Sequence, residues 1–195
     1  MKNLLSSLSK ISETSIDSNI VKNVLDKVDY KSIDYKEYIS GYDLSKYNKI
    51  EIKNKPMKIF MVTWPPQATL PIHQHNKYWG YIMVLKGLIN ESLYTYDDKS
   101  KVLSIHPSRN IKKGEIIYEP LNIIHQLTNP SPLDISVSIH FYYPPQYDYE
   151  GTLMFDVDNR KLAELNKDAP NVSWNHPDKF YKRMEDNAFE ITKMW

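Results

Sequence analysis

The 195-residue sequence contains no cysteine, so the chain can form no disulfide bond and has no thiol nucleophile of its own. Glycine is scarce as well, with 5 residues. No apolar run approaches the ~20 residues that span a bilayer. The start at Met1 lacks the unbroken apolar stretch and small-residue cleavage site of a signal peptide. We therefore expect a cytoplasmic protein.

Neither sign of charge is in excess, because 25 Lys and Arg residues face 24 Asp and Glu residues. This balance gives no reason to expect a nucleic-acid or membrane partner. The length is that of one domain with a sizeable core. We expect a single domain over residues 1–195, present as a monomer or a weak homo-oligomer. It would comprise a helical region at 1–46, a barrel at 47–150 and a C-terminal extension at 151–195.

Two apolar stripes near the amino terminus have helical spacing. The longer stripe follows the capping candidates Asp17 and Ser18. Its members are Ile20, Val21, Val24, Leu25 and Val28. A shorter stripe consists of Leu4, Leu5, Leu8 and Ile11. The sequence therefore predicts two helices before the first strand.

From about Lys49 the apolar pattern changes to that of short strands separated by turn signals. The expected strands are Lys58–Trp64, Trp79–Leu85, Leu88–Tyr96, Val102–Ile105, Ile116–Glu119, Ile124–Thr128 and Ile135–Tyr142. Many short strands at fairly even spacing favour a mostly β sandwich or barrel, of which the jelly roll is one form.

The C-terminal extension has a weaker pattern. Thr152–Asp156 has the composition of a further strand. Beyond Pro177, the residues Phe180, Met184, Phe189 and Met194 recur at roughly helical spacing. We expect this extension to pack on the outer face or across the mouth of the barrel.

Three histidines form the most specific chemical pattern. His73 and His75 are two residues apart, so on a strand both side chains point to one face. His125 lies on a later strand and completes the set if the two strands meet inside the barrel. Three neutral imidazoles suit Fe, Cu, Ni or Zn and leave coordination positions open. We therefore predict a metal site at these three residues.

The positions around the histidines resemble the two signature motifs of the cupin superfamily. The first block contains Gln67, His73, His75, Gly80 and Gly87. The second contains Gly114, Pro120, Asn122, His125 and Asn129. Gln67 and Asn122 stand where the motifs have glycine, and Gly80 replaces the usual metal-binding glutamate. The resemblance implies a cupin jelly roll with N-terminal helices and a mixed C-terminal tail.

A three-histidine site without the glutamate is similar to that of the thiol dioxygenases, and the segment after His125 resembles cysteine dioxygenases. Ser138, His140 and Tyr142 match that family's Ser-x-His-x-Tyr-x-Pro-Pro segment and alternate on one strand face. The resemblance implies one Fe(II) per chain. It also implies a relay that orients the tyrosine hydroxyl toward substrate and oxygen.

The upstream stretch around Tyr47 resembles the part of the family that binds the substrate carboxylate. Tyr47 matches the family's tyrosine, whereas Lys49 stands in place of its arginine. Lysine is a point charge, so it fixes a carboxylate with freer geometry than arginine does. Trp79 lies beside Gly80 and is a candidate for shaping the substrate pocket. The family's thioether-forming cysteine is Gly80 here, so Tyr142 would act unlinked.

The resemblance implies an Fe(II)-dependent oxidoreductase that adds both atoms of O2 to the sulfur of a small thiol carboxylate. L-cysteine, giving cysteine sulfinate, is the first candidate substrate. The substitution at Lys49 and the glycine at Gly80 keep 3-mercaptopropionate as an alternative. A second alternative is a lyase or isomerase cupin with Zn, Ni or Mn and a tyrosine base. A third is a non-catalytic cupin, in which the barrel binds a small ligand or serves as a subunit in an assembly.

Two further features lie outside the site. His106 and His176 each precede a proline in turn-like stretches, and we predict that neither is a ligand. The Tyr143-Pro144 bond is predicted to be cis by its resemblance to the family's Ser-Pro bond.

Overall fold

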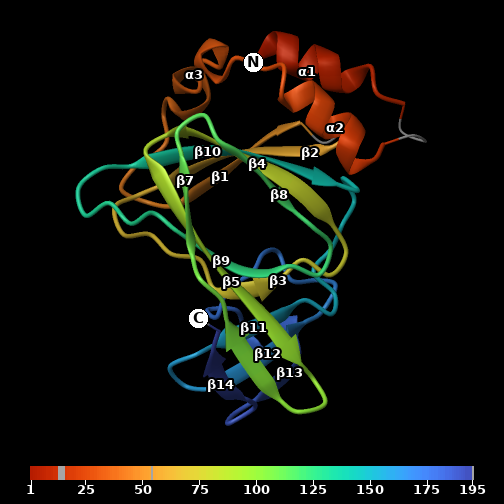
Figure 1. The fold of residues 1–195 in the computed structure, drawn as a ribbon, viewed down its shortest axis with the longest axis vertical. Helices are drawn as coiled ribbons and strands as arrows, with labels where there is room; N and C mark the ends of the chain where they lie inside the picture. The colour runs from red at the N-terminus through yellow and green to blue at the C-terminus, as the bar shows by residue number, and fades with distance from the viewer. Residues whose placement is uncertain (13–15, 54, 195) are drawn as a thin grey trace.

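The computed structural model describes residues 1–12, 16–53 and 55–194. Residues 13–15, within the predicted helical region, lie outside the described residues. Two β-sheets face each other, and the helices cover the outer side of one sheet (Figure 1). The predicted mostly β, jelly-roll fold is confirmed.

The first sheet has five strands in the order β1-β2-β10-β4-β8. These strands are β1 (Asn48–Lys53), β2 (Lys58–Trp64), β10 (Ser136–Tyr143), β4 (Trp79–Lys86) and β8 (Ile116–Glu119). All four pairings in this sheet are antiparallel. Strand β10 therefore lies at the centre of this sheet and is hydrogen-bonded on both sides.

The second sheet runs in the order β13-β12-β11-β3-β9-β5-β6-β14, and β7 also pairs with β5. Its barrel strands are β3 (Ile72–Gln74), β9 (Ile124–Thr128), β5 (Leu88–Asp97), β6 (Val102–Ile105) and β7 (Arg109–Lys112). Strand β3 pairs with β9 so that His73 lies directly opposite His125. The two halves of the histidine pattern, separated by about fifty residues, thus become cross-strand neighbours.

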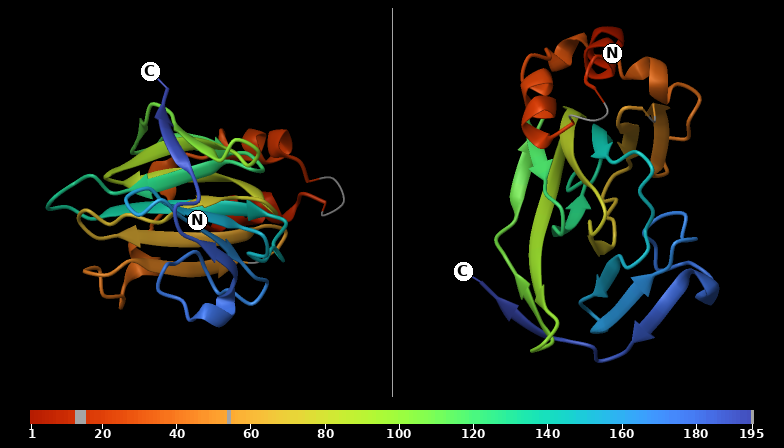
Figure 2. Two further views of the ribbon diagram at one scale, coloured as in Figure 1. Left: turned by 90° about the horizontal axis from the view of Figure 1, so that it is seen from below. Right: turned by 90° about the vertical axis from the view of Figure 1, so that its right-hand side faces the viewer.

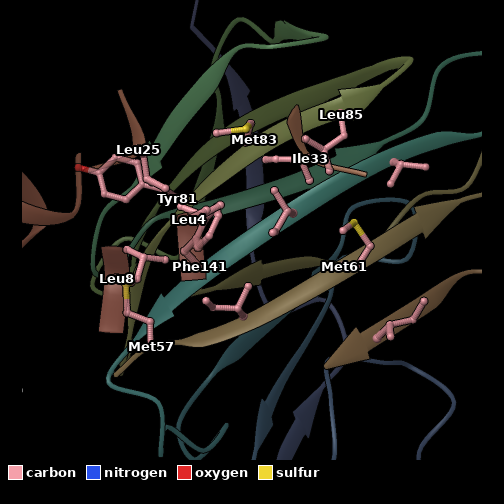
Figure 3. Close-up of a cluster of buried hydrophobic side chains, with 14 of the residues drawn as sticks. Leu4, Leu8, Leu25, Ile33, Met57, Met61, Tyr81, Met83, Leu85 and Phe141 are labelled. Atoms are coloured by element: carbon pink, nitrogen blue, oxygen red, sulfur yellow. The ribbon is translucent and has the colours of Figure 1, made fainter. Parts of the chain in front are cut away.

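The helices close the outer face of the first sheet. They are α1 (Lys2–Ser9), α2 (Ser18–Leu25), the 3-10 helix η2 (Tyr30–Ser32) and α3 (Lys36–Ile39). The Asp17 side chain caps α2 by accepting a hydrogen bond from the Ile20 amide at 2.9 Å, as its position predicted. Leu8 and Leu25 project from α1 and α2 onto the sheet, where they meet Met83 and Phe141 (Figure 3). Each such side chain stabilises the fold by roughly 1.5–3 kcal/mol through burial.

Strand β10 contributes to both faces of the first sheet because its side chains alternate. Ile139 and Phe141 belong to the apolar cluster under the helices. Ser138, His140 and Tyr142 point to the other side, between the two sheets, and all three are buried. The polar residues of this strand therefore face the barrel interior.

The C-terminal extension differs from its prediction in part. The expected strand at Thr152–Asp156 is present as β11 (Leu153–Asp156), followed by β12 (Lys161–Leu165). The helical spacing beyond Pro177 is misleading. The structure has the short 3-10 helix η3 (Asp178–Phe180) and then strands β13 (Tyr181–Glu185) and β14 (Glu190–Lys193). Strand β13 extends the second sheet, whereas β14 runs parallel to β6.

These strands extend the second sheet at the end of the molecule opposite the helices (Figure 2). Alternation with period two, half buried and half exposed, describes β13 better than a helical stripe does. The spacing of the four apolar residues fits a helical period and a strand period, each in part. Strand pairing decides between the two structures, and the sequence does not show that pairing.

Two departures from the cupin motifs keep the backbone shape that glycine would give. Gln67 and Asn122 have φ angles of 59° and 66°, in the left-handed region that favours glycine. The buried Asn129 side chain ties the connection between β9 and β10 to the end of β2 by donating to the carbonyls of Trp64, Pro65 and Asp134. The Tyr143-Pro144 bond is cis, as predicted.

No helix among the described residues is long and apolar enough to cross a membrane.

Candidate metal centre

His73, His75 and His125 converge between the two sheets. His75 Nε2 lies 3.2 Å from His73 Nε2 and 3.2 Å from His125 Nε2. All three side chains are almost completely buried. Their ligand atoms all lie within 4.8 Å of one another, close enough to share one cation. The structure therefore brings together the three residues that the spacing predicted.

Hydrogen bonds at the other ring nitrogens fix the direction of two of these imidazoles. His73 Nδ1 lies 2.9 Å from the Pro71 carbonyl oxygen, and His125 Nδ1 lies 2.9 Å from Glu91 Oε1. A carbonyl or a carboxylate oxygen only accepts, so each Nδ1 carries the hydrogen. In the neutral rings, each Nε2 then presents a lone pair to the centre. Lone pairs that point at one another in a buried site call for a cation between them.

Burial also keeps the first two imidazoles unprotonated. Burial and the neighbouring His125 lower the pKa of His73 to about 3. The same two causes hold the pKa of His75 well below its usual value. Neutral imidazole is the form that binds a metal ion. These two ligands need not lose a proton near neutral pH before they bind.

Two buried glutamates that the sequence analysis missed lie behind His125. Glu91 on β5 accepts from His125 Nδ1 and, through its other oxygen, from Arg109 Nε at 2.6 Å. Glu119, at the end of β8, places Oε1 3.3 Å from His125 Nδ1. Burial alone would lower the pKa of His125, but Glu119 and Glu91 outweigh it and raise this pKa. The sequence offered one sign of these two residues. Each is an acidic residue within a predicted strand, at a position whose side chain faces inward.

A chain of hydrogen bonds crosses the cavity wall that β10 forms. Trp64 Nε1 donates to Ser138 Oγ at 2.8 Å, and Ser138 Oγ lies 2.8 Å from His140 Nε2. His140 Nδ1 lies 2.8 Å from the Tyr142 hydroxyl. The structure thus brings the predicted Ser138, His140 and Tyr142 together. It adds Trp64, which the sequence analysis did not connect to them.

Lys49 lies in the same cavity. Its ammonium is 4.1 Å from the centre of the Phe60 ring and 3.3 Å from the Tyr149 hydroxyl. Its charge contributes to lowering the pKa of His73 and of His140. No carboxylate within the described part of the chain lies at ion-pair distance from it. Lys49 is therefore a cation in the cavity that no acidic side chain of the described residues neutralises.

Tyr149 is a cavity residue that the sequence analysis missed. The segment that carries it alternates, with Tyr147 and Tyr149 turned inward. The acidic neighbours Asp148 and Glu150 turn outward to Lys77, at 2.6 and 3.1 Å. Tyr147 also stacks on Tyr78, with ring centres 4.0 Å apart. This stacking holds Tyr147 against Tyr78, which lies three residues after His75.

The cavity has a volume of about 880 Å³. His73 and His125 line it on the side of the second sheet, and Lys49, His140 and Tyr142 line it on the side of the first. Tyr47 lines it too and packs edge-on against Trp64, with ring centres 5.1 Å apart. His73 and His125 therefore face the same space as the predicted substrate residues Tyr47 and Lys49.

Trp79 is not brought into this cavity. It packs among Tyr81, Tyr118 and Tyr143 on the helix side of the first sheet. Strand alternation explains this placement, because Gly80, its neighbour, takes the inward position. A side chain at Gly80 would clash with the Tyr142 ring and with the Phe141 carbonyl oxygen. Glycine is thus needed for Tyr142 to lie where it does.

The other two histidines lie apart from the centre. His106 Nε2 is 2.9 Å from Thr95 Oγ1, and His176 Nε2 is 2.9 Å from the Asn171 carbonyl oxygen. Within the described part of the chain, neither belongs to a group of residues that could hold a metal ion.

Comparison with known proteins finds one matching family model. The model described as "Cysteine dioxygenase type I" matches residues 2–153. Cysteine dioxygenase type 1 of Rattus norvegicus is 26% identical over 100 residues, which are 50% of this chain and 50% of that protein. The protein of the same name from Danio rerio is 21% identical over 151 residues, covering 74% of this chain and 75% of that one. The chain spans about half the length of the mammalian relatives it matches.

Among solved structures, a sugar phosphate isomerase of the cupin superfamily from Silicibacter pomeroyi is 10% identical, with a TM-score of 0.47. The match covers 76% of this chain and 82% of that one. A likeness at this level carries no argument about the activity of the chain.

Proposed function

This chain belongs to the cysteine dioxygenase type I family, and on that premise we propose that it is an Fe(II)-dependent thiol dioxygenase. The reaction adds both atoms of O2 to the sulfur of a small thiol carboxylate and yields a sulfinic acid. L-cysteine is the first candidate substrate, and 3-mercaptopropionate is the second. Small thiols and O2 are its only proposed partners.

The proposed iron ligands are His73, His75 and His125. These donors fit an iron ion. The Nε2 lone pairs of His73 and His125 both point toward His75, and each of these Nε2 atoms lies 3.2 Å from His75 Nε2. Three neutral imidazoles leave positions open on a metal ion, as catalytic sites require. When bound, Fe(II) would favour the thiolate form of the substrate and supply the redox chemistry that O2 needs.

The wall opposite the histidines binds the organic part of the substrate. Lys49 supplies the positive charge that a substrate carboxylate needs. The Tyr149 hydroxyl, at 3.3 Å from Lys49 Nζ, provides a second polar contact for that carboxylate. Tyr47 stands beside them in the cavity wall. The carboxylate is thus held across the cavity from the histidines, which leaves the thiol end facing them.

The β10 relay orients the hydroxyl of Tyr142. Trp64 can only donate to Ser138, so Ser138 retains its own hydrogen for His140 Nε2. His140 Nδ1–H then donates to the Tyr142 oxygen, which leaves the Tyr142 hydrogen for the cavity or for the Glu119 carboxyl, whose pKa the Tyr142 hydroxyl lowers. Burial raises the pKa of Tyr142 well above its usual value, so the hydroxyl keeps its proton. In this arrangement Tyr142 donates a hydrogen bond to the reacting substrate or to oxygen.

One observation carries the proposal. Three buried imidazoles converge on one side of a cavity whose other side holds an unneutralised lysine and a hydrogen-bonded tyrosine. A carboxylate at Lys49 and a thiol at the histidines match this distribution of charge and donors.

The test is oxygen uptake by protein loaded with Fe(II) under nitrogen and then given L-cysteine, 3-mercaptopropionate or cysteamine in air. We expect uptake with a thiol carboxylate, matched by sulfinate, and much weaker uptake with cysteamine, which has no carboxylate. Uptake only with 3-mercaptopropionate would retain the reaction and change the substrate. An iron-loaded protein that consumes no oxygen with any of the three would contradict the proposal.

A further inference from the structure

Glu119 is a buried carboxyl group that makes no hydrogen bond of ordinary geometry among the described residues. Its side chain is completely buried. Burial raises its pKa to about 7, and the nearby Tyr142 hydroxyl acts in the opposite direction. The nearest ring nitrogen is His125 Nδ1, 3.3 Å from Oε1. Burying a carboxylate without partners is costly, so such a group is rarely retained unless it has a function.

No lysine or arginine of the described chain lies at ion-pair distance from Glu119. Arg109 is paired with Glu91, with its Nε 2.6 Å from Glu91 Oε2. Lys49 lies across the cavity beside Phe60 and Tyr149. Glu119 does not line the cavity, so a bound substrate would not neutralise it either. The Glu91–Arg109 pair is close to neutral, which leaves Glu119 as the carboxyl group behind His125 that no lysine or arginine neutralises.

The position of Glu119 follows from the pairing of β8 with β4. Glu119 lies directly opposite Gly80 in that pairing. The cupin motif carries its metal-binding glutamate at the position of Gly80. Here the carboxylate comes instead from the neighbouring strand, and it meets the Nδ1 side of His125 rather than the point where the three Nε2 atoms converge.

We propose that Glu119 is the counter-charge of the metal centre. It is a positioning residue that acts through the His125 ring to strengthen binding of a divalent cation. The cation would lie at Nε2 and the carboxylate at Nδ1, so one imidazole connects the two opposite charges. Carboxylates that contact the second nitrogen of a ligating histidine raise its basicity and hold its orientation. This inference depends on the proposed function only for the three-histidine metal site, and not for the thiol chemistry.

The test compares the wild type with Glu119→Gln, which keeps the size of the side chain and removes its charge. The first readout is the equilibrium affinity for Zn(II), and for Fe(II) under nitrogen, measured by competition with a chelator. We expect affinity to fall about 10- to 100-fold, the range seen when such partners of metal ligands are lost. Glu119→Asp keeps the charge at a greater distance, and its affinity should lie between the other two.

The second readout is the melting temperature of the metal-free protein. Glu119→Gln should melt at the wild-type temperature or above it, because an uncompensated buried carboxyl has been removed. A merely structural role would lower the melting temperature and the affinity together. Glu115→Gln is the matched control. Glu115 is exposed directly before β8, the strand that ends at Glu119, and it accepts from the Lys112 amide, as a glutamine oxygen also would.

The outcomes separate this inference from the proposed function. A wild type that binds neither metal would overturn the three-histidine site and the inference with it. A wild type that binds metal, together with a Glu119→Gln variant within twofold of its affinity, would overturn the inference alone. Weaker binding with unchanged or higher metal-free stability is the result that supports it.

Discussion

The two walls of the cavity contain the same residue type in opposite roles. On the second sheet, His73 and His125 give their Nδ1 hydrogens to acceptors and direct Nε2 into the site. On the first sheet, His140 uses both ring nitrogens, one toward Ser138 and one toward Tyr142. A histidine with one nitrogen held by an acceptor is ready to bind a metal, whereas a histidine with both engaged can only relay a hydrogen bond.

This difference assigns the tasks of the proposed reaction to separate walls. The wall of the second sheet would hold the metal ion, and its variants should alter metal content. The wall of the first sheet would hold the substrate and the proton donor, and its variants should alter kinetics at constant metal content. Each variant below tests whether the tasks separate in this way.

The largest effect is expected at His125. His125→Ala should reduce Zn(II) or Fe(II) affinity by at least ~100-fold, because it removes a ligand rather than a partner of one. Activity should be lost in proportion. His140→Gln is the matched control, since it changes an equally buried histidine on the opposite wall. Loss of metal from both variants would show that metal binding is not confined to the wall of the second sheet.

Removing the hydroxyl of Tyr142 should give the next largest effect. Tyr142→Phe should lower kcat about 10²-fold, because the ring remains while the proposed donor is lost. Metal content and KM should stay near wild type, as measured by elemental analysis and steady-state oxygen uptake. Tyr118→Phe, on the outer face, serves as the comparison. An unchanged kcat in Tyr142→Phe would remove Tyr142 from the reaction.

Lys49→Met should mainly raise KM. We expect an increase of about 10-fold for thiol carboxylates, the value of one hydrogen bond to a charged group. Cysteamine, which lacks the carboxylate, should show no such increase. Lys46→Met, at an exposed lysine nearby, is the control. An equal rise for cysteamine would mean that Lys49 supports the fold of the cavity and not the carboxylate.

Tyr149→Phe should have the smallest effect. The variant keeps the ring and loses only the hydroxyl that lies 3.3 Å from Lys49 Nζ. A KM increase of about 3-fold for thiol carboxylates is expected, as for one neutral hydrogen bond. In the Lys49→Met background the same change should have little further effect, because the two groups would serve one carboxylate. Full additivity in the double variant would contradict that shared role.

Much of this arrangement could be predicted from local pattern. Spacing of two on a strand placed His73 beside His75, and the alternation of Ser138, His140 and Tyr142 put them on one face. The cap at Asp17 and most strands of the barrel also follow from local sequence. These features depend on neighbours in the chain, which is the information that a single sequence carries.

The remaining features depend on pairing between distant strands. Glu119 comes to His125 only because β8 pairs with β4 and the two sheets face each other. Trp79 was expected in the pocket, but the register of β4 gives the inward position to Gly80, and strand alternation therefore turns Trp79 outward. Tyr149 depends on the salt bridges of Lys77, about seventy residues away. The strands of the tail likewise require partners that no local spacing identifies.

The most direct test of the proposed dioxygenase reaction is the fate of oxygen. Iron-loaded protein would be given L-cysteine or 3-mercaptopropionate under oxygen-18 gas, and the sulfinate would be analysed by mass spectrometry. The proposed reaction predicts that both oxygen atoms added to sulfur carry the label. A product with one labelled atom or none, or an oxidised thiol that is not a sulfinate, would contradict it.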